Sequence, residues 1–123
     1  MRPLFLIDSI TEITPAMAGA VIVSGSHGGR SVSVYALGIQ PHPYAVFFND
    51  AGIGKENAGI VALEHLEQAG VICGAYSHES ARIGEAQDGL ANGVISATNR
   101  QAISAGIMPG QSVAEAADQL RRT

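Results

Sequence analysis

Short apolar runs alternate with segments of helical pattern along most of this chain, and this alternation is the feature that most limits its possible folds. The runs have the length and the β-branched and aromatic content of buried strands. Strands that alternate with helices favour a mostly parallel sheet covered on both faces. We therefore predict a three-layer, Rossmann-like (flavodoxin-like) α/β fold with a sheet of about four strands. The predicted strands are Leu4–Ile7, Ala20–Val23, Tyr44–Phe48 and Val71–Tyr76.

Helical patterns with recognisable ends lie between and after these runs. Thr14-Pro15 is typical of the start of a short helical turn, and Ser112 with Glu115 forms a capping box. The spacing over residues 94–102 predicts a helix, with a fifth short strand at Val94–Ser96 as the alternative. The other predicted helices are Ser31–Leu37, Lys55–Ala69, a segment from Ala81 onward, and a last helix with the inner stripe Val113, Ala116, Ala117 and Leu120.

Length and composition exclude several classes of protein. The 123 residues fit one α/β domain, residues 1–123, with a real core. A formal net charge of −4 argues against nucleic acid or an anionic membrane as partner, since both attract clustered Lys and Arg. The single cysteine, Cys73, excludes an intrachain disulfide and a cysteine-only metal cluster. Without a signal peptide or a long apolar run, we expect a cytoplasmic protein. The Gly- and Ala-rich, weakly charged composition predicts a homo-oligomer.

Three consecutive predicted strands end in polar loops, Ser24–Arg30, Asn49–Lys55 and Ser77–Arg82. The carboxyl ends of parallel strands meet at one edge of a sheet, which is where α/β proteins bind ligands. This convergence predicts one crevice that holds possible nucleophiles, bases and anion-binding groups. The side chains that it would bring together are Ser24, Ser26, His27, Asp50, Lys55, His78, Ser80 and Arg82.

The loop Asn49–Gly59 has the layout of an anion-binding turn. A strand leads into two glycines, Gly52 and Gly54, and then into Lys55 and a predicted helix. Glycines let backbone N–H groups approach a ligand, and a helix N-terminus adds partial positive charge. The loop is not a Walker A motif, because that motif needs glycine where Asn49 stands and Ser or Thr after the lysine. The pattern thus predicts a polar site at this turn.

The segment Ser24–Arg30 follows an apolar strand and reads SGSHGGR. Locally it resembles the phosphate loop of universal stress proteins. In that family the loop lies near the end of the chain, whereas most of this chain follows it. We interpret the likeness as convergent loop chemistry and assign no family.

These residues predict a small, cofactor-independent enzyme that hydrolyses or otherwise cleaves an anionic small molecule with amide or carbonyl groups. Lys55 and Arg82 would hold negative charge, Ser26 would be the nucleophile, and a histidine would activate it. Asp50 would orient that base or act as a general acid or base. The predicted catalytic residues are Ser26, His27, Asp50, Lys55 and His78, and the predicted substrate-binding residues are Ser24, Gly28, Gly29, Asn49, Gly54, Ser80 and Arg82.

Two alternatives to this enzyme stay open. In the first, His27, Asp50 and His78 hold a divalent metal as a two-histidine, one-carboxylate set. In the second, the same loops belong to a non-catalytic module that binds an anion or nucleotide, or to the small subunit of a larger enzyme. The two classes differ in one contact, because a catalytic site needs Ser26 or an equivalent within hydrogen-bond reach of a histidine or lysine.

Overall fold

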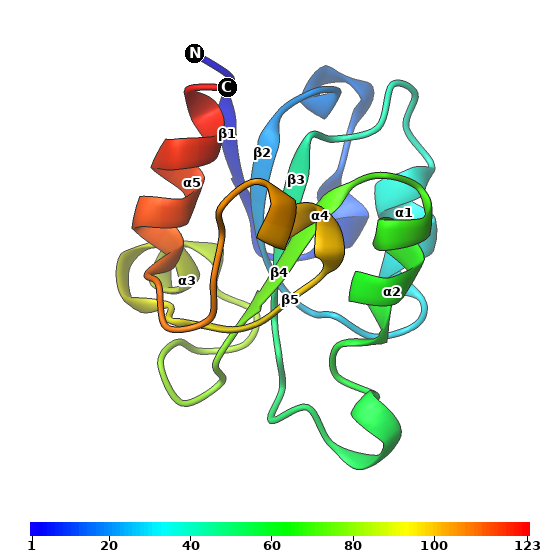
Figure 1. Cartoon of the computed structure of the whole chain (residues 1–123). Coiled ribbons are helices and arrows are strands. Elements are labelled where there is room, and N and C mark those ends of the chain that lie inside the picture. The colour runs from blue at the N-terminus through cyan, green and yellow to red at the C-terminus, as the bar shows by residue number, and fades with distance from the viewer.

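The computed structural model describes all 123 residues and contains a single five-stranded sheet (Figure 1). The strands lie side by side in the order in which they occur in the chain. The first four are parallel, and the fifth pairs antiparallel with the fourth. The strands are β1 (Leu4–Ile7), β2 (Val21–His27), β3 (Ala45–Asn49), β4 (Ile72–Tyr76) and β5 (Ile95–Thr98).

Helices connect the strands and close the chain. Three of them are single 3-10 turns, and the other five are α-helices. The 3-10 turns are η1 (Ile10–Glu12), η2 (Pro15–Met17) and η3 (Lys55–Asn57), and the α-helices are α1 (Val32–Leu37), α2 (Val61–Gln68), α3 (Ala86–Asn92), α4 (Arg100–Ser104) and α5 (Val113–Arg121).

The predicted α/β class with a mostly parallel sheet is confirmed, and the structure is compatible with a Rossmann-like fold. The sequential strand order differs from the 2-1-3-4-5 order of flavodoxin-like proteins, in which the order reverses at a switch point. The four strands expected from the sequence are all present, and β5 adds a fifth.

Buried apolar side chains form two clusters, one on each face of the sheet. The first cluster draws on the two turns after β1 and on α1 and α2, through side chains such as Ile10, Ala36 and Leu66. The second draws on α4 and α5, through Ala102 and Leu120. Figure 1 shows α1 and α2 on one side of the sheet and α3 and α5 on the other. A sheet covered in this way buries its central strands, and every residue of β3 and β4 is buried.

The last helix forms where the sequence predicts it, with one of the two hydrogen bonds of the predicted capping box. The Ser112 hydroxyl accepts a hydrogen bond from the Glu115 N–H, as expected for an N-cap. The predicted inner stripe is buried throughout. The helix over Ser31–Leu37 is also confirmed as α1, and it ends at Gly38. In both helices the sequence signals lie within a few residues of the ends that they mark, so local sequence was sufficient to predict these helices.

The prediction of a helix over residues 94–102 is wrong. Ile95–Thr98 forms β5, whose Ile95 side chain is buried, and a helix begins only at Arg100. Asn99 separates the two elements, and its side-chain oxygen accepts a hydrogen bond from the Ala102 N–H as a helix N-cap. A run this short fits both periodicities, and pairing with the free edge of β4 decides in favour of the strand.

The prediction of one helix over Lys55–Ala69 is correct only in its second half. Lys55–Asn57 is a 3-10 turn, and α2 begins at Val61. Glu56 and Asn57 have φ angles of 55° and 60°, in the left-handed region that an α-helix cannot contain. The predicted helix N-terminus at Lys55 is therefore displaced to Val61, away from the lysine.

Asn99 also ties β4 to α2 and α4. Its amide nitrogen donates to the carbonyls of Leu63 and Val71, and its side-chain oxygen accepts from the N–H of Cys73. The Asn99 N–H donates to the Cys73 carbonyl, so this residue continues the hydrogen-bonding of β4 where β5 ends. Since Asn99 is buried, these hydrogen bonds are shielded from water, and the loss of its side chain would leave buried polar groups with fewer partners.

No helix in the structure is both long enough and apolar enough to cross a membrane.

We predict that Asn99→Ala lowers the free energy of unfolding by about 3 kcal/mol, because buried donors and acceptors lose their partner. Urea denaturation measures the change. The matched control is Asn92→Ala, since exposed Asn92 bonds only to Asp88, and it should change stability by less than about 0.5 kcal/mol. Equal effects of the two substitutions would contradict the role given to Asn99.

Candidate functional site

The loops that follow β2, β3 and β4 lie at one edge of the sheet, as predicted, because these neighbouring strands are parallel. The first loop is shorter than expected. Strand β2 continues through Ser24 and Ser26 to His27, with a change of register between Val23 and His27. Such irregularities re-aim side chains at the end of a strand. His27 is thereby placed at the rim of the sheet, while Ser24 is buried within it.

A cavity of about 240 Å³ lies at this edge, between the loop after β2 and the start of α2. Arg30 and Lys55 bring two permanent positive charges to its wall, and His27 adds a third when it is protonated. Glu56 is the one acidic side chain on the wall. The lining residues are His27, Gly29, Arg30, Lys55, Glu56, Ala58 and Val61.

The sequence predicts three residues of this cavity, His27, Gly29 and Lys55, and it misses Arg30. The signal for Arg30 was its place directly after the two glycines of the loop. Gly29 has a steric role here, because a Cβ at this position would lie 2.6 Å from His27 Nε2. Glycine therefore leaves room for the imidazole against the backbone.

A second polar cluster at the same edge is built on Asp50. Its Oδ1 accepts hydrogen bonds from the N–H groups of Gly52 (2.8 Å) and His78 (3.0 Å), and its Oδ2 accepts one from the Ser96 hydroxyl (2.6 Å). The ring Nδ1 of His78 lies 3.3 Å from Oδ1. The Asp50 side chain is only 5% exposed, whereas that of His78 is 51% exposed. A carboxylate thus orients an imidazole whose other nitrogen can reach a solvent-borne molecule.

Opposing effects set the ionisation of Asp50. Burial by itself raises the pKa of this carboxyl, but hydrogen bonds from Ser96, Gly52 and His78 outweigh it and bring the pKa below its ordinary value. Asp50 is therefore a carboxylate at neutral pH, and its Oδ1 lies within reach of the His78 ring. The sequence predicts the pairing of Asp50 with a histidine, whereas Ser96 reaches it from β5, which the sequence did not identify as a strand.

The loop from Asp50 to Gly59 holds an unusual backbone. Ala51, Ile53, Glu56 and Asn57 all have φ angles between 51° and 65°. Non-glycine residues in this region cost about 1–3 kcal/mol each and persist only where the surroundings hold them. Such strain gathers at functional sites, and β-branched Ile53 is the least tolerant of it.

Short contacts keep this loop in place. The Ile53 N–H donates to the Asp50 carbonyl, and the Gly59 N–H donates to the Ile53 carbonyl, both at 2.6 Å. A Cβ at Gly59 would lie 2.1 Å from the Asp50 carbonyl oxygen, so only glycine fits there. The loop thus closes on itself at Asp50 and Gly59 and presents Lys55 to the cavity.

The remaining predicted residues do not join these two groups. Ser26 Oγ accepts from the Ile10 N–H and contacts no histidine or lysine. Ser24 Oγ accepts from the Ser26 N–H, and the Ser24 carbonyl accepts from Tyr76. Burial, together with the carboxylates of Asp88 and Asp8, raises the pKa of Tyr76, which keeps its hydroxyl as a donor.

Other predicted ligand groups are used within the fold. Asn49 donates to the Ala81 carbonyl and accepts from the Ala51 N–H. Ser80 donates to the Ser77 carbonyl and accepts from the Val94 N–H. The N–H groups of Gly28 and Gly54 donate to the carbonyls of Asn49 and Gly52, which leaves neither free for an anion.

Arg82 points into solvent, with its side chain 80% exposed and 3.9 Å from Glu85. The side chains predicted to share one crevice are therefore divided: His27 and Lys55 line the cationic cavity, Asp50 and His78 form the second cluster, and Arg82 lies at the surface. The metal alternative is not supported by the geometry, because no group of three His, Cys, Asp or Glu side chains is close enough together to hold an ion.

No family model matches the chain, and no curated protein or solved structure matches it either.

The lowered pKa of Asp50 predicts a pH-dependent contribution to stability. The folded state holds the carboxylate more strongly than the unfolded chain does, so the stabilisation is complete above the ordinary pKa of about 3.9 and is lost as the pH falls through the lower folded value. Asp50→Asn should therefore have a lower free energy of unfolding than the wild type at neutral pH. This difference between the two proteins, the stability gap, should become smaller on acidification.

Urea denaturation at neutral pH and at about pH 3 measures this gap. Asp118→Asn is the control, because Asp118 is a half-exposed carboxylate on α5 that pairs with Arg122. A gap between Asp50→Asn and the wild type that does not narrow with acid would contradict the stabilised carboxylate.

Proposed function

We propose that this protein binds a small anionic molecule, one that carries a phosphate or carboxylate group, in the cavity lined by His27, Arg30 and Lys55. The observation that carries the proposal is the meeting of two permanent cations and an imidazole on one small cavity wall. The chain as a whole has a net charge of −4, so this cavity is a local exception. Arg suits the planar oxygens of carboxylate and phosphate, and Lys adds a mobile point charge.

The size of the cavity supports a small ligand. Its volume of about 240 Å³ lies below the range of roughly 300–1,000 Å³ typical of pockets for drug-sized molecules. Free phosphate or a short carboxylic acid would fill such a space, whereas a dinucleotide would not. The local likeness of Ser24–Arg30 to a phosphate loop supports the same class of ligand.

Lys55 should contribute directly to the binding of this anion. It is the only lysine of the chain, and it sits on the strained loop rather than on a regular helix. A loop held by internal contacts places the charge before the ligand arrives, which lowers the entropy cost of binding. Glu56 on the same wall disfavours very large negative charge, so a small anion is preferred over a polyanion.

We predict that Lys55→Ala weakens binding of inorganic phosphate by about ten- to a hundredfold, because a charged hydrogen bond contributes roughly 1.5–3 kcal/mol. Calorimetric titration of phosphate, and separately of malonate, into both proteins measures the change and distinguishes phosphate from carboxylate ligands. Arg82→Ala is the matched control, since it removes the same charge from a solvent-exposed site. Equal affinity in Lys55→Ala and wild type for both anions would overturn the proposal.

A hydrolase is the second candidate function, and the pair Asp50–His78 favours it. A buried carboxylate that orients a half-exposed imidazole is an arrangement for general acid–base catalysis. Ser26 has no base within reach, so the nucleophile would be a water molecule activated by His78 rather than the serine hydroxyl. An amide or carbonyl substrate with an anionic group would be the expected class.

We predict that His78→Ala lowers the hydrolysis of p-nitrophenyl acetate by about a hundredfold, the size expected for the loss of a general base. The rate of p-nitrophenolate release above the buffer rate is the measurement. His42→Ala is the control, because it removes another imidazole at the opposite edge of the sheet. Equal rates in the two variants would mean that His78 does not act as the base.

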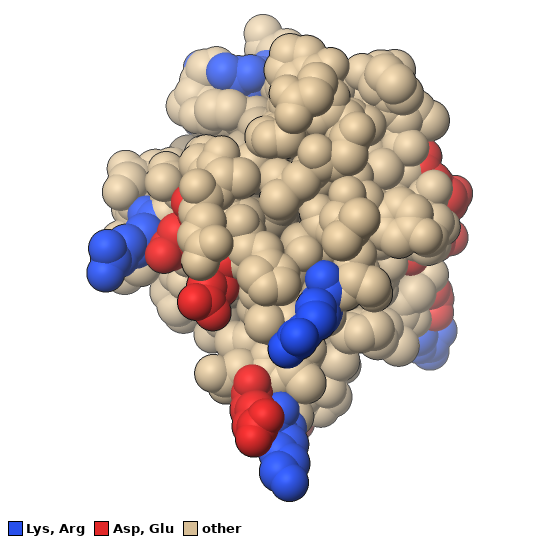
Figure 2. Space-filling view, turned by 90° about the vertical axis from the view of Figure 1, so that its right-hand side faces the viewer, with Lys and Arg blue, Asp and Glu red and all other residues tan.

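Assembly into a homo-oligomer stays a prediction. Figure 2 shows a broad area without Lys, Arg, Asp or Glu above the centre of the face that bears α1 and α2. Two apolar side chains of α1, Val34 and Tyr35, are 72% and 45% exposed. These observations support a contact between copies, and closed symmetry is its usual form.

A further inference from the structure

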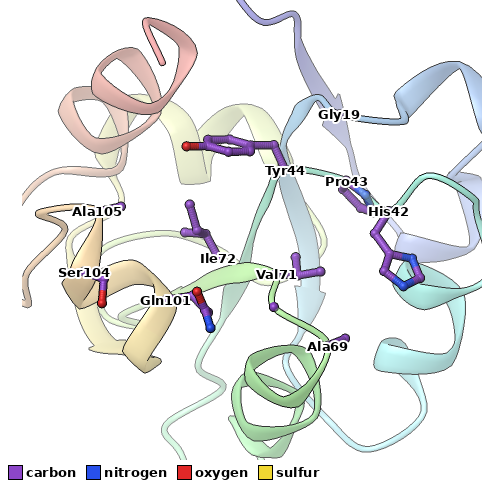
Figure 3. A pocket seen from close by; sticks show the side chains of 11 residues that line it. Gly19, His42, Pro43, Tyr44, Ala69, Val71, Ile72, Gln101, Ser104 and Ala105 are labelled. Atoms are coloured by element: carbon purple, nitrogen blue, oxygen red, sulfur yellow. The ribbon is translucent and has the colours of Figure 1, made fainter.

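The largest cavity of the protein, about 490 Å³, lies at the opposite edge of the sheet from the cationic cavity. It opens at the amino ends of two strands, where Tyr44 precedes β3 and Val71 precedes β4, and α4 forms its third side (Figure 3). Its volume falls within the range of roughly 300–1,000 Å³ of ligand pockets. We call it the amino-edge cavity.

The amino-edge cavity contains no Lys, Arg, Asp or Glu among its lining residues. Arg2 contacts the wall from outside the lining, and its charge is directed at the wall itself. Its guanidinium stacks on the Tyr44 ring, 3.7 Å from the ring centre, and its Nη1 donates to the Gly19 carbonyl. Because an ionised ligand would lose water here without gaining an opposite charge, the cavity favours a neutral molecule.

The floor of the cavity is apolar. Pro43, Val71 and Ile72 are buried, and the Tyr44 ring stands beside Ile72 (Figure 3). Arg2 covers one face of that ring and is not itself part of the lining, so the ring is held in place from outside. A rigid aromatic wall beside aliphatic side chains suits a flat ring, since both surfaces lose water together.

Three polar side chains, Gln101, Ser104 and His42, lie at the rim of the cavity. The side-chain amide of Gln101 and the hydroxyl of Ser104 both come from α4 and line the cavity, where a ligand can reach them. His42 uses Nδ1 to bond the Ile39 carbonyl at 3.0 Å, which fixes the ring and leaves Nε2 on its other side. These groups can donate to and accept from a ligand such as an amide, which offers both functions.

We propose that the amino-edge cavity binds a neutral small molecule that carries a planar ring and an amide-like group. The ring packs against Tyr44 and Ile72, and the polar group bonds Gln101 and Ser104. This site is separate from the proposed anion site, because the two cavities share no residue and lie at opposite edges of the sheet. Both can therefore be occupied at the same time.

Three probes of one shape but different charge test the proposal: benzamide, benzoate and benzamidinium. Titration of each into the isotope-labelled full chain, followed by two-dimensional NMR, gives the dissociation constant and the amides that shift. We expect benzamide to shift the amides of Ile72 and Gln101 saturably and to bind at least about tenfold more tightly than either ion, a difference of about 1.4 kcal/mol. Equal binding of the three probes, or shifts at scattered sites, would overturn the proposal.

Two substitutions on α4 show where the probe binds. Ser104→Phe fills the cavity from an exposed position and should abolish benzamide binding, whereas Ile103→Ala changes an exposed side chain outside the lining and should leave it unchanged. Saturating phosphate should not change the affinity for benzamide, because the anion site is remote. Benzamide binding that survives Ser104→Phe in a folded protein would place the ligand elsewhere and refute this site.

Discussion

The carboxylate of Asp50 is the interaction on which this edge of the structure depends. It is buried, and it accepts hydrogen bonds from its own loop at Gly52, from His78 after β4 and from Ser96 of β5. A buried carboxylate without such donors would strongly destabilise the folded protein, because its charge would lose hydration without compensating hydrogen bonds. A single side chain therefore fixes the three segments relative to one another. The same side chain orients His78 and positions the start of the loop that carries Lys55.

The loop beyond Asp50 shows how far tertiary contacts override local preference. Neither Ile53 nor Glu56 favours the left-handed backbone that it adopts. The conformation is held where Gly59 packs against the Asp50 carbonyl with no room for a side chain. The strain is thus carried by the part of the chain that presents Lys55, which is the pattern expected where backbone geometry serves a site rather than the core.

The sequence predicted features that depend on neighbouring residues better than features that depend on contacts between distant residues. The apolar runs located four strands, and parallel pairing brought their loops to one edge. His27 and Lys55 were found because each stands beside glycines in such a loop. Ser96 was missed because its partner Asp50 is 46 residues away, and Ser26 was misjudged because its hydroxyl is used by the Ile10 N–H. Periodicity over a few residues could not separate strand from helix at β5.

The strand order explains why the cationic cavity and the amino-edge cavity lie at the two ends of the sheet. In doubly wound folds a crevice opens where the strand order reverses and neighbouring helices diverge to opposite faces. Here β1 to β4 run in sequence order, and the turns and helices between them all pack on one face. No such crevice arises between the parallel strands, so these two cavities are formed outside the sheet, by loops and, at the amino edge, also by α4. The carboxyl-edge cavity has cations on its wall, whereas the lining of the amino-edge cavity contains no Lys, Arg, Asp or Glu.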